Sequence, residues 1–120
     1  VAAIRAREKP ADSSPINLEI SPEQTKEKMD NGEVMLIDVR EPWENDTTKI
    51  EGSNLIPLGE LPAKLNKLPK DTSIVVYCHH GNRSLLAAKM MHAAGFADAK
   101  SMKGGIEEWS RTVDSTVPTY

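Results

Sequence analysis

Residues 74–84 read IVVYCHHGNRS, an apolar stretch that runs directly into a polar loop holding the only cysteine of the chain, Cys78. A short, unbroken apolar run predicts a strand buried on both faces of a parallel sheet. After the loop, residues 85–94 are rich in alanine and methionine and predict a helix that Gly95 ends. Sites in open α/β sheets lie at the carboxyl ends of strands, and this is where Cys78 falls.

The same alternation of apolar strands and amphipathic helices continues on both sides of this stretch. Ser21, Pro22 and Gln24 form a capping-box pattern at the start of a helix that Gly32 is placed to end. The other expected strands are 16–20, 34–39, 54–57 and 99–102; the other expected helices are 58–68 and a last one from Gly105, and 40–53 is expected to be a polar loop. This order predicts an α/β fold with a largely parallel sheet.

Length and charge limit the classes of function. The 120 residues, 38% of them apolar, suit one domain, which we expect over residues 16–120, with residues 1–15 as a flexible tether. A net charge of -3 argues against nucleic acid as a partner, and no apolar run is long enough to span a bilayer. A lone cysteine forms no internal disulfide and indicates a reducing compartment, so we expect a cytoplasmic protein. We also expect a monomer.

The loop after Cys78 has the composition of an anion site. A tight turn followed by a helix directs backbone N–H groups and the positive end of the helix dipole towards the sulfur, and Arg83 adds a fixed cation. Gly81 gives the turn backbone angles that other residues resist, and Ser84 is expected to cap the helix. The alternatives are an inert buried thiol at Cys78 and a solvated surface role for Arg83.

Two further pairs of residues bear on this loop: His79 with His80, and Asp38 with Arg40. His79 and His80 follow Cys78 directly, but adjacent residues cannot surround a zinc ion tetrahedrally without ligands from elsewhere, so we expect no metal and no cofactor. Asp38 and Arg40 stand at the end of the apolar run 34–39, where a carboxylate needs donors.

Four segments resemble the rhodanese family in order and spacing: LIDVREPWE at 36–44, IPL at 56–58, the Cys78 loop, and GGIEEW at 104–109. The resemblance covers about residues 16–120 and implies a three-layer rhodanese-like fold, with helices on both faces of the sheet. It also implies a ping-pong sulfurtransferase in which Cys78 takes sulfur from a donor such as thiosulfate and passes it, as a persulfide, to a thiophilic acceptor. Substrate-binding residues would be His79, His80, Gly81, Asn82, Arg83 and Ser84. Asp38 and Arg40 would support the loop or form a strand-end salt bridge.

The resemblance also ranks the alternatives. Phosphatases and arsenate reductases of this fold carry one more residue between cysteine and arginine, whereas the four here fit a sulfur atom. A non-catalytic rhodanese-like binding module is disfavoured because Cys78 and Arg83 are both present. Many relatives that use thiosulfate well carry Arg or Lys where His79 stands, so thiosulfate is expected to be a poor donor. The closing segment 109–120 resembles rhodanese domains fused to enzymes that adenylate sulfur carriers, which suggests a sulfur-carrier protein or a cysteine desulfurase as partner.

Overall fold

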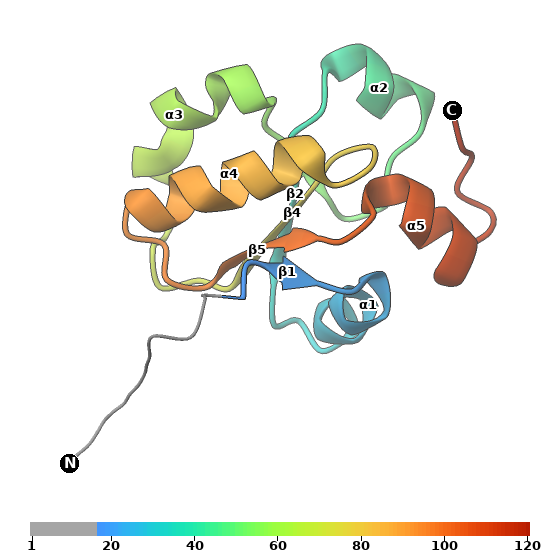
Figure 1. The fold of residues 1–120 in the computed structure, drawn as a ribbon, viewed down its shortest axis with the longest axis horizontal. Coiled ribbons are helices and arrows are strands. Elements are labelled where there is room, and N and C mark those ends of the chain that lie inside the picture. Colours follow the sequence, from blue (N-terminus) through green and yellow to red (C-terminus); the bar gives the residue numbers. More distant parts are fainter. Residues whose placement is uncertain (1–16) are drawn as a thin grey trace.

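The computed structural model describes residues 17–120, so the expected tether at 1–15 and the start of the domain at Ile16 lie outside the described residues. Five strands form one sheet in the order β1-β5-β4-β2-β3, and every neighbouring pair is parallel (Figure 1). The strands are β1 (Glu19–Ile20), β2 (Met35–Asp38), β3 (Asn54–Leu55), β4 (Ile74–Tyr77) and β5 (Ala99–Met102). The predicted parallel α/β sheet is confirmed.

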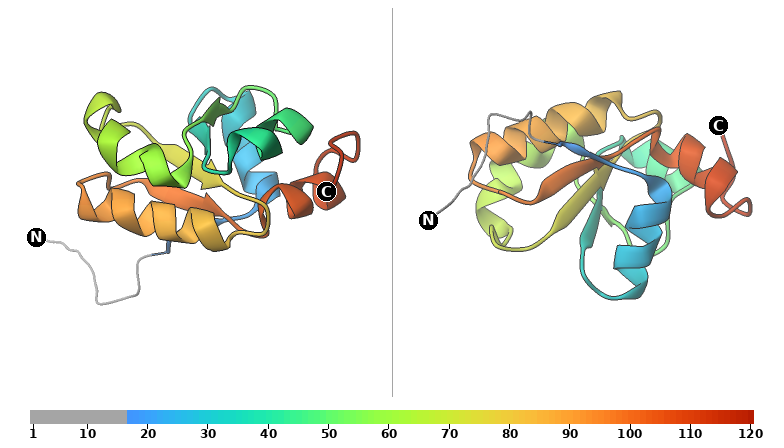
Figure 2. Two further views of the ribbon diagram at one scale, coloured as in Figure 1. Left: turned by 90° about the horizontal axis from the view of Figure 1, so that it is seen from above. Right: turned by 60° about the horizontal axis from the view of Figure 1, so that its bottom comes forward.

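Helices cover both faces of this sheet, as Figure 2 shows from two further sides. Alternate residues along β4 and its continuation point to opposite faces: Val76 and then Cys78, just after the strand, join the core with α3 (Leu61–Lys64) and α4 (Asn82–Ala93). Val75 and Tyr77 join the second core, with α1 (Pro22–Asp30) and α5 (Gly105–Thr112). This three-layer arrangement is the one that the resemblance to the rhodanese family implies. No helix in residues 17–120 is long and apolar enough to cross a membrane.

The start of α1 follows the predicted capping box: the Ser21 side chain accepts from the Gln24 backbone N–H, and the Gln24 side chain accepts from the Ser21 N–H. The prediction of an unbroken loop at 40–53 is wrong, because α2 (Pro42–Thr47) lies within it. Pro42 occupies the first helical turn, and Glu41 and Glu44 form a second capping box.

The predicted continuous helix at 58–68 is also wrong. The segment consists of a 3₁₀ turn (Leu58–Glu60), α3, and a second 3₁₀ turn (Leu65–Lys67). Pro62 has no N–H to donate to the carbonyl of Leu58 four residues earlier, and the Leu61 N–H bonds to that carbonyl instead. The tighter i→i+3 bond produces the first 3₁₀ turn.

Candidate active site

Cys78 follows the last residue of β4, at the carboxyl end of the sheet. Its Sγ accepts hydrogen bonds from the backbone N–H groups of Gly81 at 3.1 Å and Ser84 at 3.3 Å. The cysteine is only 1% exposed, so these donors act on the sulfur with little competition from water. The loop therefore presents two N–H dipoles and the start of α4 to the sulfur, and this arrangement favours an anion there.

Gly81 makes the turn of this loop and is the N-cap of α4. Its φ of 107° is a left-handed conformation that favours glycine, and a Cβ there would lie 3.2 Å from the backbone nitrogen of Gly104. The prediction that Ser84 caps the helix is wrong, since Ser84 lies inside α4. Its hydroxyl is buried, 3.5 Å from the Cys78 Sγ and 2.7 Å from the Ser101 hydroxyl of β5.

The start of α5 supports the loop from the other side. The N–H groups of Ile106 and Glu107 donate to the carbonyls of Cys78 and His79 at 2.9 and 3.2 Å. Gly105 permits this close approach: a Cβ at this position would lie 2.3 Å from the His79 oxygen and 2.5 Å from the Cys78 oxygen. The GGIEEW segment is part of the predicted resemblance, but this role of Gly105 was not predicted.

Arg83, expected to face an anion, has a protein partner. Its Nη1 and Nη2 donate to Oε1 and Oε2 of Glu44 at 2.7 and 2.9 Å, a two-point ion pair between α4 and α2. The Glu44 side chain is 4% exposed, whereas that of Arg83 is 37% exposed. Arg83 therefore holds the buried carboxylate with one edge of its guanidinium group while part of the group stays open to solvent. Glu44 was not predicted as a site residue.

The ion pair with Arg83 is the largest influence on Glu44, and it lowers the pKa of this carboxyl group from 4.5 to about 2. A carboxyl group whose pKa is lower in the folded state stabilises the fold above its unfolded-state pKa, and that contribution is lost as pH falls through the folded value. We therefore expect the chain to lose stability between pH 4.5 and 2, and the Glu44→Gln variant to lose less over the same range. Urea unfolding of both proteins at several pH values measures the difference; parallel curves would exclude Glu44 as the cause.

Asp38 and Arg40 form a fully buried ion pair at 2.7 Å. This is the strand-end salt bridge, one of the two predicted roles of the pair. Arg40 donates also to the Thr48 carbonyl at 2.7 Å and, through Nη1, to the Tyr120 hydroxyl at 3.0 Å. The Tyr120 hydroxyl in turn donates to Oε2 of Glu44 at 2.6 Å. The predicted supporting pair thus reaches the Cys78 loop through Tyr120, which was not predicted as a site residue.

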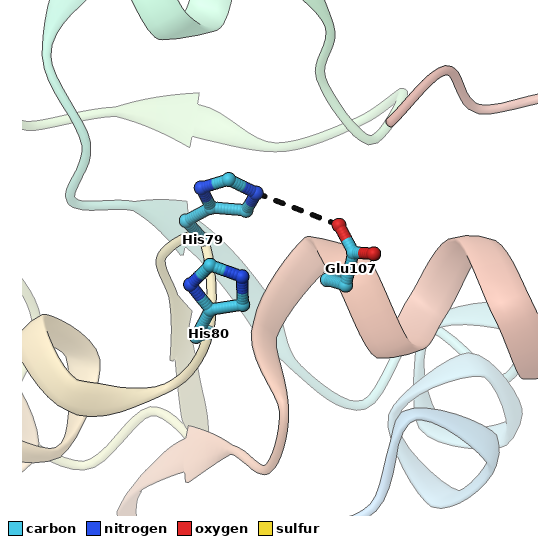
Figure 3. A group of neighbouring side chains, drawn as sticks. All are labelled: His79, His80 and Glu107. Carbon is cyan, nitrogen blue, oxygen red and sulfur yellow. Dashed lines mark ion pairs between the residues drawn. The ribbon is translucent and has the colours of Figure 1, made fainter. Parts of the chain in front are cut away.

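His79 and His80 lie at the mouth of the loop beside Glu107 of α5 (Figure 3). Their ligand atoms lie within 4.8 Å of one another, and His79 Nε2 is 3.5 Å from Glu107 Oε1. The two imidazole rings are stacked, however, with centroids 3.9 Å apart and planes 19° apart. Imidazole lone pairs lie in the ring plane, so in nearly parallel rings they do not converge on one ion. One ring would have to turn before this group could chelate a metal.

The fold and the Cys78 loop both have counterparts in a known protein family. The family model for the rhodanese-like domain matches residues 21–112. The chain belongs to the rhodanese-like domain family. The matched residues of this rhodanese-like domain include the Cys78 loop, Glu44 and Gly105, but not Tyr120.

Relatives of this rhodanese-like domain include named sulfurtransferases. The probable adenylyltransferase/sulfurtransferase MoeZ of Mycobacterium tuberculosis is 38% identical over 84% of the chain, which spans only 26% of that protein. The thiosulfate sulfurtransferase GlpE of Ectopseudomonas mendocina is 34% identical over 80% of the chain and 87% of the relative. A rhodanese-related protein from Thermoplasma volcanium has a crystal structure with a TM-score of 0.73 and 32% identity, covering 79% of this chain and 92% of that one.

Proposed function

We propose that the domain is a sulfurtransferase that carries sulfane sulfur as a persulfide on Cys78. The observation that supports this most strongly is the convergence of the Gly81 and Ser84 N–H groups on the Cys78 Sγ. Donors preorganised around a sulfur atom stabilise negative charge on a thiolate and on a persulfide without rearrangement of the loop.

The reaction has two steps. The Cys78 thiolate attacks the outer sulfur of thiosulfate, a new S–S bond forms, and the old S–S bond breaks so that sulfite leaves with the electron pair. A nucleophile such as cyanide or a thiolate then attacks the outer sulfur of the persulfide, takes it away, and returns the Cys78 thiolate. The outer sulfur of the persulfide lies about 2 Å beyond Sγ. We propose that the remaining N–H groups of residues 79–84 bind this outer sulfur and that the loop is the binding site for donor and acceptor.

The physiological donor is proposed to be a persulfide on a protein and not thiosulfate. Histidines follow Cys78 where efficient users of thiosulfate are expected to have Arg or Lys, so the loop lacks a fixed cation there. Arg83, the cation nearest in sequence, is already shared with Glu44. Because the segment 109–120 resembles rhodanese domains fused to enzymes that adenylate sulfur carriers, a sulfur-carrier protein is the proposed acceptor. The lone cysteine supports a cytoplasmic setting.

A sulfurtransferase assay tests this proposal. The purified chain is incubated with thiosulfate and cyanide, and thiocyanate is measured; a parallel sample receives an aryl phosphate, and phosphate is measured. We expect thiocyanate to form slowly and to increase with protein concentration, and no phosphate to be released. Phosphate release without thiocyanate would select a phosphatase, and neither product would select a binding module.

A further inference from the structure

Tyr120 contacts both His79 of the reactive loop and Glu44, the carboxylate that pairs with Arg83. Its ring stacks on the ring of His79, with centroids 3.9 Å apart and planes 9° apart. Its hydroxyl donates to Oε2 of Glu44 at 2.6 Å, the same oxygen that Nη2 of Arg83 contacts at 2.9 Å. One side chain therefore contacts His79 directly and reaches Arg83 through Glu44.

The segment that carries Tyr120 is fixed to the body of the domain. The Ser110 hydroxyl of α5 donates to the Val117 carbonyl at 2.6 Å, and the Val117 N–H donates to the Asp114 carbonyl at 3.1 Å. Val117 and Tyr120 also pack against the apolar core on the α1 and α5 side of the sheet. These contacts hold the phenol ring in place beside the loop.

The hydroxyl of Tyr120 also joins two ion pairs. It accepts from Nη1 of the buried Arg40 at 3.0 Å and donates to Glu44, so that Arg40, Tyr120, Glu44 and Arg83 form one chain of hydrogen bonds. Donation from Arg40 polarises the phenol and strengthens its bond to the carboxylate. The hydroxyl thereby offsets part of the negative charge on Glu44, and this leaves more of the positive field of Arg83 for an anion at the loop.

We propose that Tyr120 is a positioning residue of the sulfur-donor site, where it sets how far Glu44 neutralises Arg83 and fixes the ring of His79. This inference rests on the proposed function, because it names a residue that controls how an anionic donor is received. Tyr120 lies more than 35 residues from Cys78 in sequence and reaches the site only through the fold.

Removal of the hydroxyl has a defined consequence for the field at Cys78. In Tyr120→Phe the ring can still stack on His79, but Glu44 loses a donor, so its uncompensated charge opposes the approach of anions. We expect the KM for thiosulfate to rise about three- to tenfold, the size of one hydrogen bond. We expect kcat to change less, because the donors to the sulfur are untouched.

Alkylation of Cys78 gives a readout that does not depend on sulfur transfer. Iodoacetate is an anion and iodoacetamide is neutral, and both react with the only thiol of the chain. The rate constant for iodoacetate divided by that for iodoacetamide therefore reports the electrostatic field at Cys78. We expect this ratio to fall severalfold in Tyr120→Phe, and to change little when the same substitution is made in a Glu44→Gln background, because the carboxylate that mediates the effect is then absent.

Tyr77→Phe is the matched control. Its hydroxyl is also hydrogen-bonded, accepting from the Ile50 N–H at 3.2 Å and lying 2.9 Å from the Ser53 hydroxyl, but it does not contact Glu44. We expect Tyr77→Phe to lose about as much stability as Tyr120→Phe, but to keep the alkylation ratio and the KM of the unmodified chain. All assays are run below the melting temperature of the least stable variant. An unchanged ratio in Tyr120→Phe, whether both rate constants stay the same or fall by the same factor, would overturn the role of Tyr120. Absence of thiocyanate from the unmodified chain would instead overturn the proposed function and leave the alkylation test intact.

Discussion

The Cys78→Ser variant is expected to form no thiocyanate above background from thiosulfate and cyanide. A serine hydroxyl stays protonated where a thiol ionises, and an oxygen atom at this position cannot carry a sulfane sulfur through the persulfide cycle. The serine oxygen can still accept from the N–H groups of Gly81 and Ser84, so the loop keeps its hydrogen bonds. The measurement is the initial rate of thiocyanate formation at equal protein concentrations.

Thermal unfolding provides the control for this variant. Since Cys78 packs in the core on the α4 side of the sheet, a modest fall in melting temperature is expected. Cys78→Ala, which is apolar and cannot leave an unpaired hydroxyl, serves as the second variant. Thiocyanate formation by a folded Ser or Ala variant at the rate of the unmodified chain would rule out Cys78 as the sulfur carrier.

The Gly105→Ala variant is expected to be the most destabilising single-methyl substitution among the glycines near the site. Gly105 has a φ of 66°, and its new Cβ would lie 2.3 Å from the His79 oxygen and 2.5 Å from the Cys78 oxygen. Both atoms belong to the backbone, so they cannot move without disturbing the loop. We expect a loss of free energy of unfolding on the order of 3 kcal/mol, from backbone strain and displacement of the loop.

Activity should fall together with stability in Gly105→Ala. The displaced start of α5 weakens the bonds that Ile106 and Glu107 donate to the carbonyls of Cys78 and His79. Gly59→Ala is the matched control, since its Cβ would meet nothing within 4 Å and its φ is not positive. The free energy of unfolding in urea and the rate of thiocyanate formation should both stay close to those of the unmodified chain in Gly59→Ala. Equal stability of the two variants would refute the close approach at Gly105.

The sheet and the loop could be predicted because their signals are local. The apolar run before Cys78 and the glycine at position 81 identify a buried strand and a turn without knowledge of any other segment. Helix α2 is not predicted because the segment 42–47 is short and mostly polar, and Trp43 alone forms no apolar period. The break in the segment 58–68 depends on one proline, Pro62, within a pattern of leucines that otherwise predicts a continuous helix.

The partners of the loop could not be found in the same way. Glu44 lies 39 residues before Arg83, and Tyr120 lies 76 residues after Glu44. Such pairs are brought together at the carboxyl end of the sheet, where α2, the start of α4 and Tyr120 meet, and no spacing rule within a single element indicates them. The sequence therefore identified Arg83 as a cation near the sulfur but gave no sign that a buried carboxylate shares it.

Intact mass spectrometry of the chain after exposure to thiosulfate tests the persulfide most directly. The mass should rise by that of one sulfur atom, the addition should map to the peptide that contains Cys78, and cyanide should remove it with release of thiocyanate. No such addition should appear on Cys78→Ser. Thiocyanate formation by a chain that never gains the sulfur atom, or an equal gain by the serine variant, would contradict a sulfur anion held by the N–H groups of Gly81 and Ser84.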